Sequence, residues 1–358
     1  MEREIKIERI RKYIRENGLS GILISKVSNF AWLTGGKRNF VALYGEKGVC
    51  SILITQSKIF LLTNNIEYPR IFEEEVNNIE FIVKKWYREN ELYEEVKKIW
   101  KGKIGSDIPM EFTVPVKLET LHFPFTNEEI ERYKELGENA SKSITEVSKD
   151  LKAGMKEIEI AGIVSKNLWE RNIIPVVILV AADERIEKYR HPIPTEKSVN
   201  ERVMIVICAK RQGLIASLTR IINFGKIDDE IKRKHKSVCY VDSVFIEETK
   251  AGKKISDVFK KGVEAYKKEG FKSEWELHHQ GGPTGYSTRY FRASENTDEK
   301  IIEKSAFAWN PSITGTKSED TIIVGKENNI IITEDKNWPV VEIEYNGKIY
   351  KRPDILEK

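Results

Sequence analysis

A chain of 358 residues is long enough for one or two domains with sizeable apolar cores. Charged residues make up 32% of it, but 60 Lys and Arg nearly balance 56 Asp and Glu, so the formal net charge is only +4. This mixed charge, without a basic tail or stripe, argues against nucleic acid or a membrane surface as partner. No apolar run approaches membrane-spanning length, and the charged residues after Met1 do not resemble a signal peptide. We therefore expect a soluble, cytoplasmic protein.

The cysteines support the same compartment. Cys50, Cys208 and Cys239 show no CxxC or other metal-binding spacing, and an odd number of cysteines fits reduced cytosolic thiols. Abundant Lys, Glu and Ile with few Cys and Met is also typical of a thermophile.

The first part of the chain alternates between helical and strand patterns. Ile7, Ile10 and Ile14 recur at helical spacing. Apolar runs at 49–55 and 58–63 predict a hairpin. Other patterns predict strands at 21–24, 79–83 and 103–107 and helices at 29–36, 67–75 and 91–99. This alternation predicts a small α/β domain.

The second part begins after a stretch, residues 108–125, that contains three prolines and no clear period. We interpret this stretch as a linker. Thr126 and Glu129 have the spacing of a capping box, which opens a long helix. Helices are predicted at 126–151, 157–171, 228–249 and 255–268, and strands at 175–181, 202–209, 214–223, 306–309, 321–324, 330–333, 340–345 and 348–351. This pattern predicts an α+β domain in which helices cover a largely antiparallel sheet, with a hairpin turn at Asn346-Gly347.

Residues 278–290 are the most unusual stretch. His278 and His279 are two of only five histidines, and they precede a Gly-Gly-Pro sequence that suits neither a helix nor the interior of a central strand. Histidine transfers protons near neutral pH, and glycine lets the backbone approach a ligand closely. Tyr286 and Arg289 add a proton carrier and a group that binds anions. A surface turn that happens to hold two histidines explains the pattern equally well.

Two other positions have a functional and a structural interpretation. Two prolines follow His191 closely and would hold its imidazole in a defined place, although an ordinary proline-rich loop has the same composition. Arg220 ends a strand pattern and would bind a carboxylate through two parallel hydrogen bonds, or pair with an acid on the sheet.

Residues 308–321 form a polar bend between two apolar strands. The bend contains Asn310, Lys317, Glu319 and Asp320. So many donors and acceptors between strands are hard to explain by packing alone, so we expect a binding or catalytic role.

The order of these clusters resembles the creatinase/prolidase/aminopeptidase P family, whose catalytic domain has the pita-bread fold. The resemblance covers nearly the whole chain and rests on residues 29–35 (similar to Tyr-Leu-Thr-Gly), 151–161 (Lys-Pro-Gly-x-x-Glu), 213 with 217–220 (Gly-Tyr-x-x-Asp-x-Thr-Arg), 281–285 (Gly-His-Gly-x-Gly), 310–311 (Glu-Pro-Gly) and 318–321 (Glu-Asp-Thr). It implies an α/β two-domain protein, with a creatinase-like N-terminal α/β domain over residues 1–121 and an α+β pita-bread domain over residues 122–358. It also implies a homodimer, in which the N-terminal domain of one subunit lies near the site of its partner.

The metal-binding positions of the family are mostly changed in this chain. Family peptidases hold two metal ions with two aspartates, one histidine and two glutamates. By motif position, Val206 and Ser217 replace the aspartates, Gly282 replaces the histidine, Asn310 replaces one glutamate, and only Glu319 matches. A single carboxylate does not bind a dinuclear pair. We therefore expect no catalytic metal and no cofactor.

Creatinase has the same fold and hydrolyses a C–N bond without metal, so the resemblance implies a metal-independent hydrolase or lyase acting on a small carboxylate-bearing molecule. In that role His191 is the general acid or base, and His278 or His279 is the second proton carrier. Substrate anions bind to Arg220, Arg289 and Lys317, while Glu319 and Asp320 hold a cationic group or orient a histidine. The remaining polar residues of the same segments, Tyr286 and Asn310, would contact the substrate.

Two alternatives stay open. The first is a metal-dependent Xaa-Pro dipeptidase or aminopeptidase that uses other metal ligands and takes a dipeptide-like substrate. The second is a non-catalytic binding protein that kept the fold and lost the chemistry.

Overall fold

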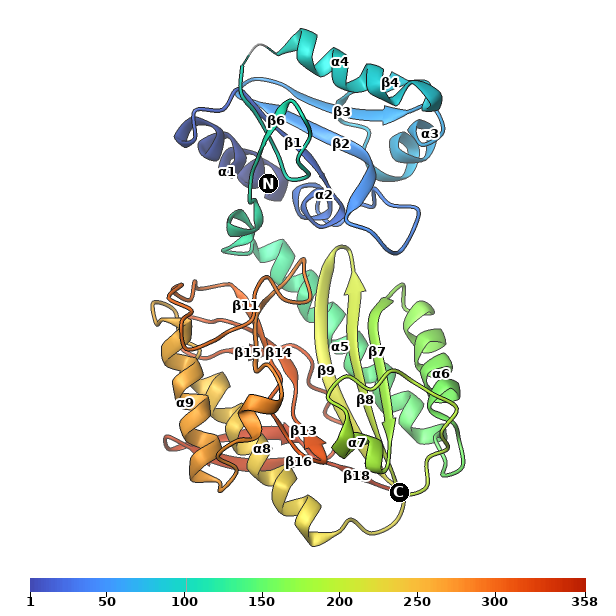
Figure 1. The fold of residues 1–358 in the computed structure, drawn as a ribbon, viewed down its shortest axis with the longest axis vertical. Coiled ribbons are helices and arrows are strands. Elements are labelled where there is room, and N and C mark those ends of the chain that lie inside the picture. The colour runs from blue at the N-terminus through green and yellow to red at the C-terminus, as the bar shows by residue number, and fades with distance from the viewer. Residues whose placement is uncertain (101) are drawn as a thin grey trace. The chain divides into compact units, whose positions relative to one another are not determined.

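The chain folds into two compact units, which divide between Phe123 and Pro124 (Figure 1). The computed structural model describes residues 1–100 and 102–358. The division lies two residues beyond the boundary that the sequence predicts between residues 121 and 122. Each unit has its own sheets and its own apolar core, as separate domains do.

A six-stranded mixed sheet forms the centre of residues 1–123. The strands run in the order β4 (Glu80–Lys84), β3 (Ile59–Asn64), β2 (Lys47–Thr55), β1 (Gly21–Lys26), β5 (Ile104–Ser106) and β6 (Thr113–Pro115). Leu23 and Leu53 point to one face of this sheet, where they pack with Leu92 and Val96 of α4 (Glu89–Ile99). On the other side of the sheet lie α1 (Glu2–Glu16) and α2 (Val27–Thr34) (Figure 1).

The predicted α/β character of this unit is confirmed, and β2 and β3 form the predicted antiparallel hairpin. The predicted helix at 67–75 is α3 (Tyr68–Arg70), which continues into a π-helical turn, η1 (Ile71–Glu75). Short 3₁₀ turns occur at η2 (Trp86–Arg88) and η3 (Glu119–His122). The interpretation of residues 108–125 as a plain linker was wrong in part, because β6 pairs with β5 at the sheet edge. A strand of three residues is too short to show a period, and an edge strand tolerates Pro115.

Residues 124–358 contain two principal sheets. The first has the order β18 (Leu356–Glu357), β9 (Leu214–Asn223), β8 (Arg202–Arg211) and β7 (Ile174–Ala182), and its three long strands are antiparallel. The helices α5 (Asn127–Asp150) and α6 (Glu157–Trp169) pack against it (Figure 1). Every residue of β9 is buried, so this strand is covered on both faces.

The second sheet is antiparallel and has the order β10 (Gly281–Thr284), β11 (Ala306–Trp309), β14 (Asp320–Ile323) and β15 (Ile330–Ile331). The helices α8 (Asp229–Glu248) and α9 (Ile255–Lys268) cover it, and Phe245 of α8 stacks on Trp309 with 4.5 Å between ring centroids. Two ribbons complete the unit: β12 (Ser312–Ile313) with β13 (Thr316–Lys317), and β16 (Val340–Tyr345) with β17 (Lys348–Pro353). The backbone N–H of Thr219 donates to the carbonyl of Glu319 at 3.1 Å, which joins β9 to the start of β14.

Most predicted elements of this unit are confirmed. Asn346 and Gly347 have φ values of 51° and 71°, as a type I′ turn between β16 and β17 requires. The exception is the Gly-rich stretch, because Gly281–Thr284 forms β10 where a turn was one expectation. Gly281 and Gly282 have φ values of 103° and 147°, so this strand is irregular and lacks the alternating pattern that predicts strands.

The capping box at the start of α5 is confirmed. The Thr126 hydroxyl accepts from the Glu129 N–H at 3.3 Å, and the Glu129 carboxylate accepts from the Thr126 N–H at 2.8 Å. Neither α5 nor any other helix in the described ranges is long and apolar enough to cross a membrane.

The cap makes a testable contribution to stability. We expect Thr126→Ala to lower the free energy of unfolding by about 1 kcal/mol, because one backbone donor of the first turn loses its acceptor. Urea denaturation followed by circular dichroism measures this change. Thr126→Ser is the matched control and should keep most of the stability, because it retains the hydroxyl. Equal losses in both variants would show that the methyl group matters and the cap does not.

Candidate active site

Three histidines far apart in the sequence lie together in the structure. His191 is in the loop after α7 (Glu184–Lys188), while His278 and His279 follow η4 (Glu274–Leu277) and precede β10. The Nε2 atoms of His191 and His278 are 3.2 Å apart. The ring centroids of His279 lie 4.4 Å from His278 and 5.7 Å from His191. The structure therefore brings together the three histidines for which the sequence suggests proton transfer.

All three imidazoles are held in the neutral form. Burial is the largest cause, followed for His191 and His278 by the charge of Lys317 and for His279 by that of Arg289. The pKa of His278 falls to about 2 and that of His279 to about 4, while the pKa of the more exposed His191 is also lowered. The Nδ1 atoms of His278 and His279 are buried without a hydrogen-bond partner among the described residues. Each of these two rings therefore has an unused nitrogen.

Glu319 is the centre of a second group of charges near the histidines. Its carboxylate accepts from Lys317 Nζ at 2.7 Å, from Arg289 Nη2 at 3.1 Å and from the Thr219 hydroxyl at 2.8 Å. Burial opposes its ionisation, but the charges of Lys317 and Arg289 outweigh it and hold the pKa of Glu319 below its usual value. Two cations and one anion leave an excess of one positive charge in this group.

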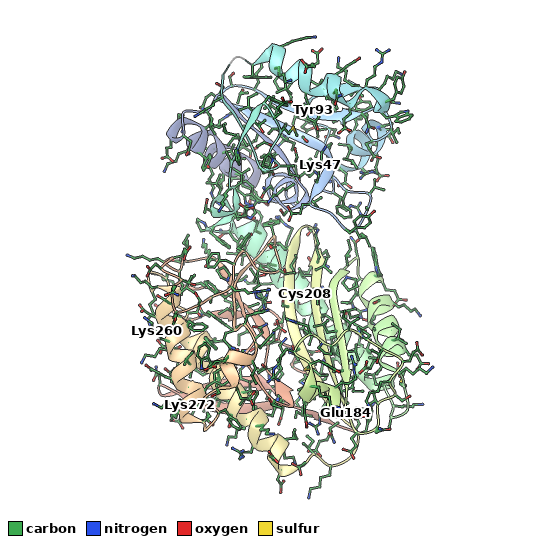
Figure 2. The ribbon with its side chains drawn as sticks, viewed as in Figure 1. Lys47, Tyr93, Glu184, Cys208, Lys260 and Lys272 are labelled. Atoms are coloured by element: carbon green, nitrogen blue, oxygen red, sulfur yellow. The ribbon has the colours of Figure 1, made fainter. Side chains whose placement is uncertain are left out.

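Ser217 and Cys208 lie side by side on β9 and β8, next to Arg289. The Ser217 hydroxyl donates to the Cys208 sulfur at 3.3 Å and accepts from Arg289 Nη1 at 3.3 Å. The position of Cys208 is labelled in Figure 2. Burial raises the pKa of the Cys208 thiol, so it is not a thiolate at neutral pH. Ser217 therefore helps to fix the guanidinium of Arg289.

Asn310 lies opposite Glu319, just beyond the paired residues of the adjacent strands β11 and β14. Trp309 of β11 pairs with Asp320 of β14, so the next residue, Asn310, continues this register opposite Glu319. Its Oδ1 atom is buried and has no partner among the described residues, as is also true of the Ser312 hydroxyl. The side-chain amide of Asn310 thus has a free acceptor at the same end of the sheet as Glu319.

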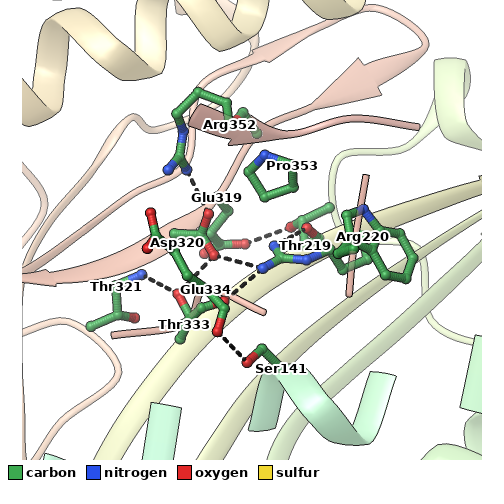
Figure 3. Close-up of polar contacts among 12 residues, drawn as sticks. Ser141, Thr219, Arg220, Glu319, Asp320, Thr321, Thr333, Glu334, Arg352 and Pro353 are labelled. Atoms are coloured by element: carbon green, nitrogen blue, oxygen red, sulfur yellow. Dashed lines mark hydrogen bonds and ion pairs between the residues drawn. The ribbon is translucent and has the colours of Figure 1, made fainter. Parts of the chain in front are cut away.

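Arg220 and Asp320 form a buried ion-pair network (Figure 3). Arg220 donates to Asp320 Oδ1 at 3.0 Å and to the Thr333 carbonyl at 2.7 Å, while Arg352 donates to Asp320 Oδ2 at 2.6 Å. Both side chains of the Arg220–Asp320 pair are at most 1% exposed. Of the two interpretations of Arg220, the structure shows pairing with an acid. The pair is buried and does not lie on the surface of the sheet.

Tyr286 also has a partner inside the protein, because its hydroxyl donates to Glu129 Oε1 at 2.8 Å and its ring is buried. We expected Tyr286, Arg220 and Asp320 to bind substrate. Their geometry joins secondary-structure elements instead, so we assign all three to the structure of the domain and not to substrate binding.

Two residues that complete these networks, Thr219 and Asp242, were not predicted from the sequence. Thr219 donates to Glu319, and Asp242 accepts from Arg352 at 2.7 Å and from the Ser318 hydroxyl at 2.6 Å. One signal was present: Asp242 is a carboxylate among apolar neighbours on α8, where Val238 and Phe245 face the core. A charged residue in the apolar stripe of a helix indicates a buried partner.

Comparisons with known proteins identify the family of this fold. The family model of the Creatinase/Prolidase N-terminal domain matches residues 6–152, and that of Metallopeptidase family M24 matches residues 131–334. The chain belongs to metallopeptidase family M24, a family of hydrolases. The resemblance inferred from the sequence motifs and the predicted two-domain fold are thereby confirmed.

Solved structures give the same architecture at low sequence identity. The Xaa-Pro dipeptidase from Bacillus anthracis is 19% identical with a TM-score of 0.80, over 99% of this chain and 100% of that chain. A prolidase from Pyrococcus horikoshii OT3 is 20% identical with a TM-score of 0.78, over 92% and 98% of the two chains. The N-terminal domain of the FACT complex subunit SPT16 from chickpea is 12% identical with a TM-score of 0.70, over 93% and 95%. No curated protein sequence matches the chain significantly.

The family positions do not fit a dinuclear metal centre in this chain. Val206 lies in an apolar cluster with Met204 and Ile221, so no ligand atom replaces the aspartate there. Gly282 has no side chain, and the carboxylate oxygens of Glu319 already accept from Lys317 and Arg289. A positively charged side chain on each carboxylate oxygen occupies the direction that a metal ion needs.

Proposed function

We propose that this chain hydrolyses the C–N bond of a small, carboxylate-bearing substrate of the dipeptide type, with Xaa-Pro dipeptides as the favoured class. The observation that carries the proposal is the group formed by Lys317, Arg289 and Glu319 beside the three-histidine cluster. The relatives named prolidase and Xaa-Pro dipeptidase support a peptide substrate better than the creatinase-like substrate of the first expectation.

The cationic pair suits the carboxylate of such a substrate. Glu319 balances only one of the two charges, so a second carboxylate near Lys317 and Arg289 completes the neutralisation. The Nε atom of Arg289 is buried and has no partner among the described residues, so it is available to donate. Hydrogen bonds between ionised groups are about twice as strong as neutral ones, which favours this arrangement.

The histidine cluster, which lies close enough to Lys317 and Glu319 to feel their charges, would act on the scissile bond. Its neutral imidazoles can accept a proton, and a general base of this kind activates a water molecule for attack on a carbonyl. The free acceptor of Asn310 would receive an N–H of the substrate. In this arrangement the charged pair binds and orients the substrate, and the histidines carry the chemistry.

A comparison of two substrates tests the charged pair. We expect Lys317→Gln to raise KM for an Xaa-Pro dipeptide about 10- to 100-fold with a smaller change in kcat, because a bound carboxylate loses a charged partner. The same variant should change KM little for the carboxamide of that dipeptide, which has no charge to bind. Lys260→Gln, on the exposed side of α9 (Figure 2), is the matched control. An equal rise in KM for both substrates contradicts carboxylate binding by Lys317.

A metal-independent, creatinase-like hydrolase or lyase is the second candidate, and the loss of four family metal positions favours it. It predicts turnover of an amidine or N-substituted amino acid that a strong chelator does not reduce. A chelator that abolishes turnover removes this candidate. Stabilisation of the protein by a dipeptide without any product would instead indicate a binding protein.

A further inference from the structure

Three of the five histidines of the chain lie together in one cluster. Substrate binding and orientation by neighbouring residues do not explain why three imidazoles are needed there. A proton relay needs one or two imidazoles. Here the ligand nitrogens of His191, His278 and His279 all lie within 4.8 Å of one another. Neutral imidazoles converging in this way are the most common nitrogen ligands of transition metals.

We propose that His191, His278 and His279 form a site for a single transition-metal ion such as Zn²⁺, separate from the positions of the dinuclear centre of the family. Metal binding as such stands on the histidine geometry alone. Its use to activate water for C–N hydrolysis rests on the proposed function.

The spacing of two of the three nitrogens fits one tetrahedral ion. With Zn–N bonds of about 2.0–2.1 Å, two ligand nitrogens are about 3.3 Å apart. The Nε2 atoms of His191 and His278 are 3.2 Å apart. Without a metal, one of these two atoms must carry a proton and the other must not. With a metal, both act as ligands, and the protons move to Nδ1.

The third ligand completes a half-open site. The His279 ring is tilted by 34° against that of His278, and its ligand nitrogen lies within 4.8 Å of those of the other two histidines, so a rotation of the His279 side chain would bring it to the ion. Three protein ligands leave a fourth position for water, as in catalytic zinc sites with three histidines.

The surrounding charges affect the affinity of the site for a metal ion, and the nitrogen ligands determine which metal it prefers. Lys317, Arg289 and Arg292 each lower the pKa of at least one of these histidines, and the same charges repel a metal ion. Glu319 offsets one of them, and the charge of Arg190 is paired with Glu274 at 2.9 Å. An all-nitrogen site therefore favours Zn²⁺, Ni²⁺ or Cu²⁺ over Mg²⁺ or Ca²⁺, which require oxygen ligands. The excess positive charge also predicts that a carboxylate ligand and the metal bind more tightly together than alone.

Metal binding is measured directly on chelator-stripped protein without an affinity tag. Elemental analysis after equilibration with Zn²⁺ should give one ion per chain. Isothermal titration should show at least an approximately tenfold weaker affinity in each of His191→Gln, His278→Gln and His279→Gln. Substitution with Co²⁺ should give the visible absorption of tetrahedral cobalt. Because His191 is exposed, its variant should fold normally.

His122→Gln is the matched control. It removes a histidine from the other compact unit, and its amide can still donate to Asn29. This variant should bind Zn²⁺ as the parent protein does. Absence of stoichiometric metal, or an affinity in the three cluster variants equal to that of the parent protein, overturns the site. Metal binding without dipeptide hydrolysis supports the site and contradicts the proposed function. Chelator-resistant hydrolysis by a protein that binds no metal does the reverse.

Discussion

Replacing Arg352 with methionine is expected to lower the free energy of unfolding by about 3–5 kcal/mol near neutral pH, because a buried ion pair would lose one partner. Arg352 is fully buried on β17 and donates to Asp242 of α8 at 2.7 Å and to Asp320 of β14 at 2.6 Å. Asp320 keeps Arg220 as a partner in the variant, as Figure 3 shows. Among the described residues, Asp242 keeps the neutral Ser318 hydroxyl as its hydrogen-bond donor.

The deficit should shrink as the pH falls. Burial raises the pKa of Asp242 even with Arg352 present, and the loss of Arg352 raises it further. A carboxyl group whose pKa is higher in the folded protein binds more protons there than in the unfolded chain, so folding gains stability as the pH falls through the folded pKa. We expect the deficit of Arg352→Met to be about 1–2 kcal/mol smaller at about pH 5 than at about pH 7.5.

Urea unfolding of both proteins at the two pH values measures this effect. Lys351→Met is the matched control, because Lys351 is the neighbouring exposed residue on the same strand. Its effect on unfolding should be within about 0.5 kcal/mol. If the deficit of Arg352→Met were the same at both pH values, lost packing and not the unpaired carboxylate of Asp242 would be its cause.

The sequence predicts elements whose pattern is local. The long helices α5 and α8 show helical periodicity and side-chain caps, and the Asn346-Gly347 turn needs only two residues with positive φ. The strands β6 and β10 were missed, because three or four residues at a sheet edge or in a Gly-rich segment carry no period. Their position depends on the strands beside them, which periodicity does not report.

The sequence identified individual candidate residues of the site, but it did not predict which of them lie close together in space. His191 and His278 are 87 positions apart, and only the fold places their Nε2 atoms 3.2 Å apart. The sequence predicted no catalytic metal at all, because only the five family positions were considered; the metal site proposed at the histidine cluster lies outside them and departs from that prediction. For Arg220 the prediction failed in the opposite way. Its position near the end of a strand suggested that it binds a substrate carboxylate, but its carboxylate partner is Asp320 of the same chain, 100 positions away.

Restoring the family histidine with Gly282→His is expected to lower the free energy of unfolding by about 3–5 kcal/mol and to add no second metal ion. Gly282 has φ 147°, a conformation that residues with a Cβ adopt only with strain. A Cβ at this position would lie 2.6 Å from the Phe291 carbonyl oxygen and 3.1 Å from the Ala293 nitrogen. These atoms are backbone and cannot turn away as a flexible side chain would.

Gly225→His separates the two causes. Gly225 also has a positive φ, 93°, but no described atom lies within 4 Å of a Cβ built on it. It should therefore lose only about 1–2 kcal/mol from backbone strain. The difference between the two variants in urea unfolding gives the cost of the close contact in β10. If Gly282→His proved as stable as Gly225→His and bound one more Zn²⁺ per chain than the parent, the backbone would still be open to the family centre. The closed geometry at Gly282 instead leaves no room for the family histidine in β10, so the metal site proposed at the three histidines does not depend on that position.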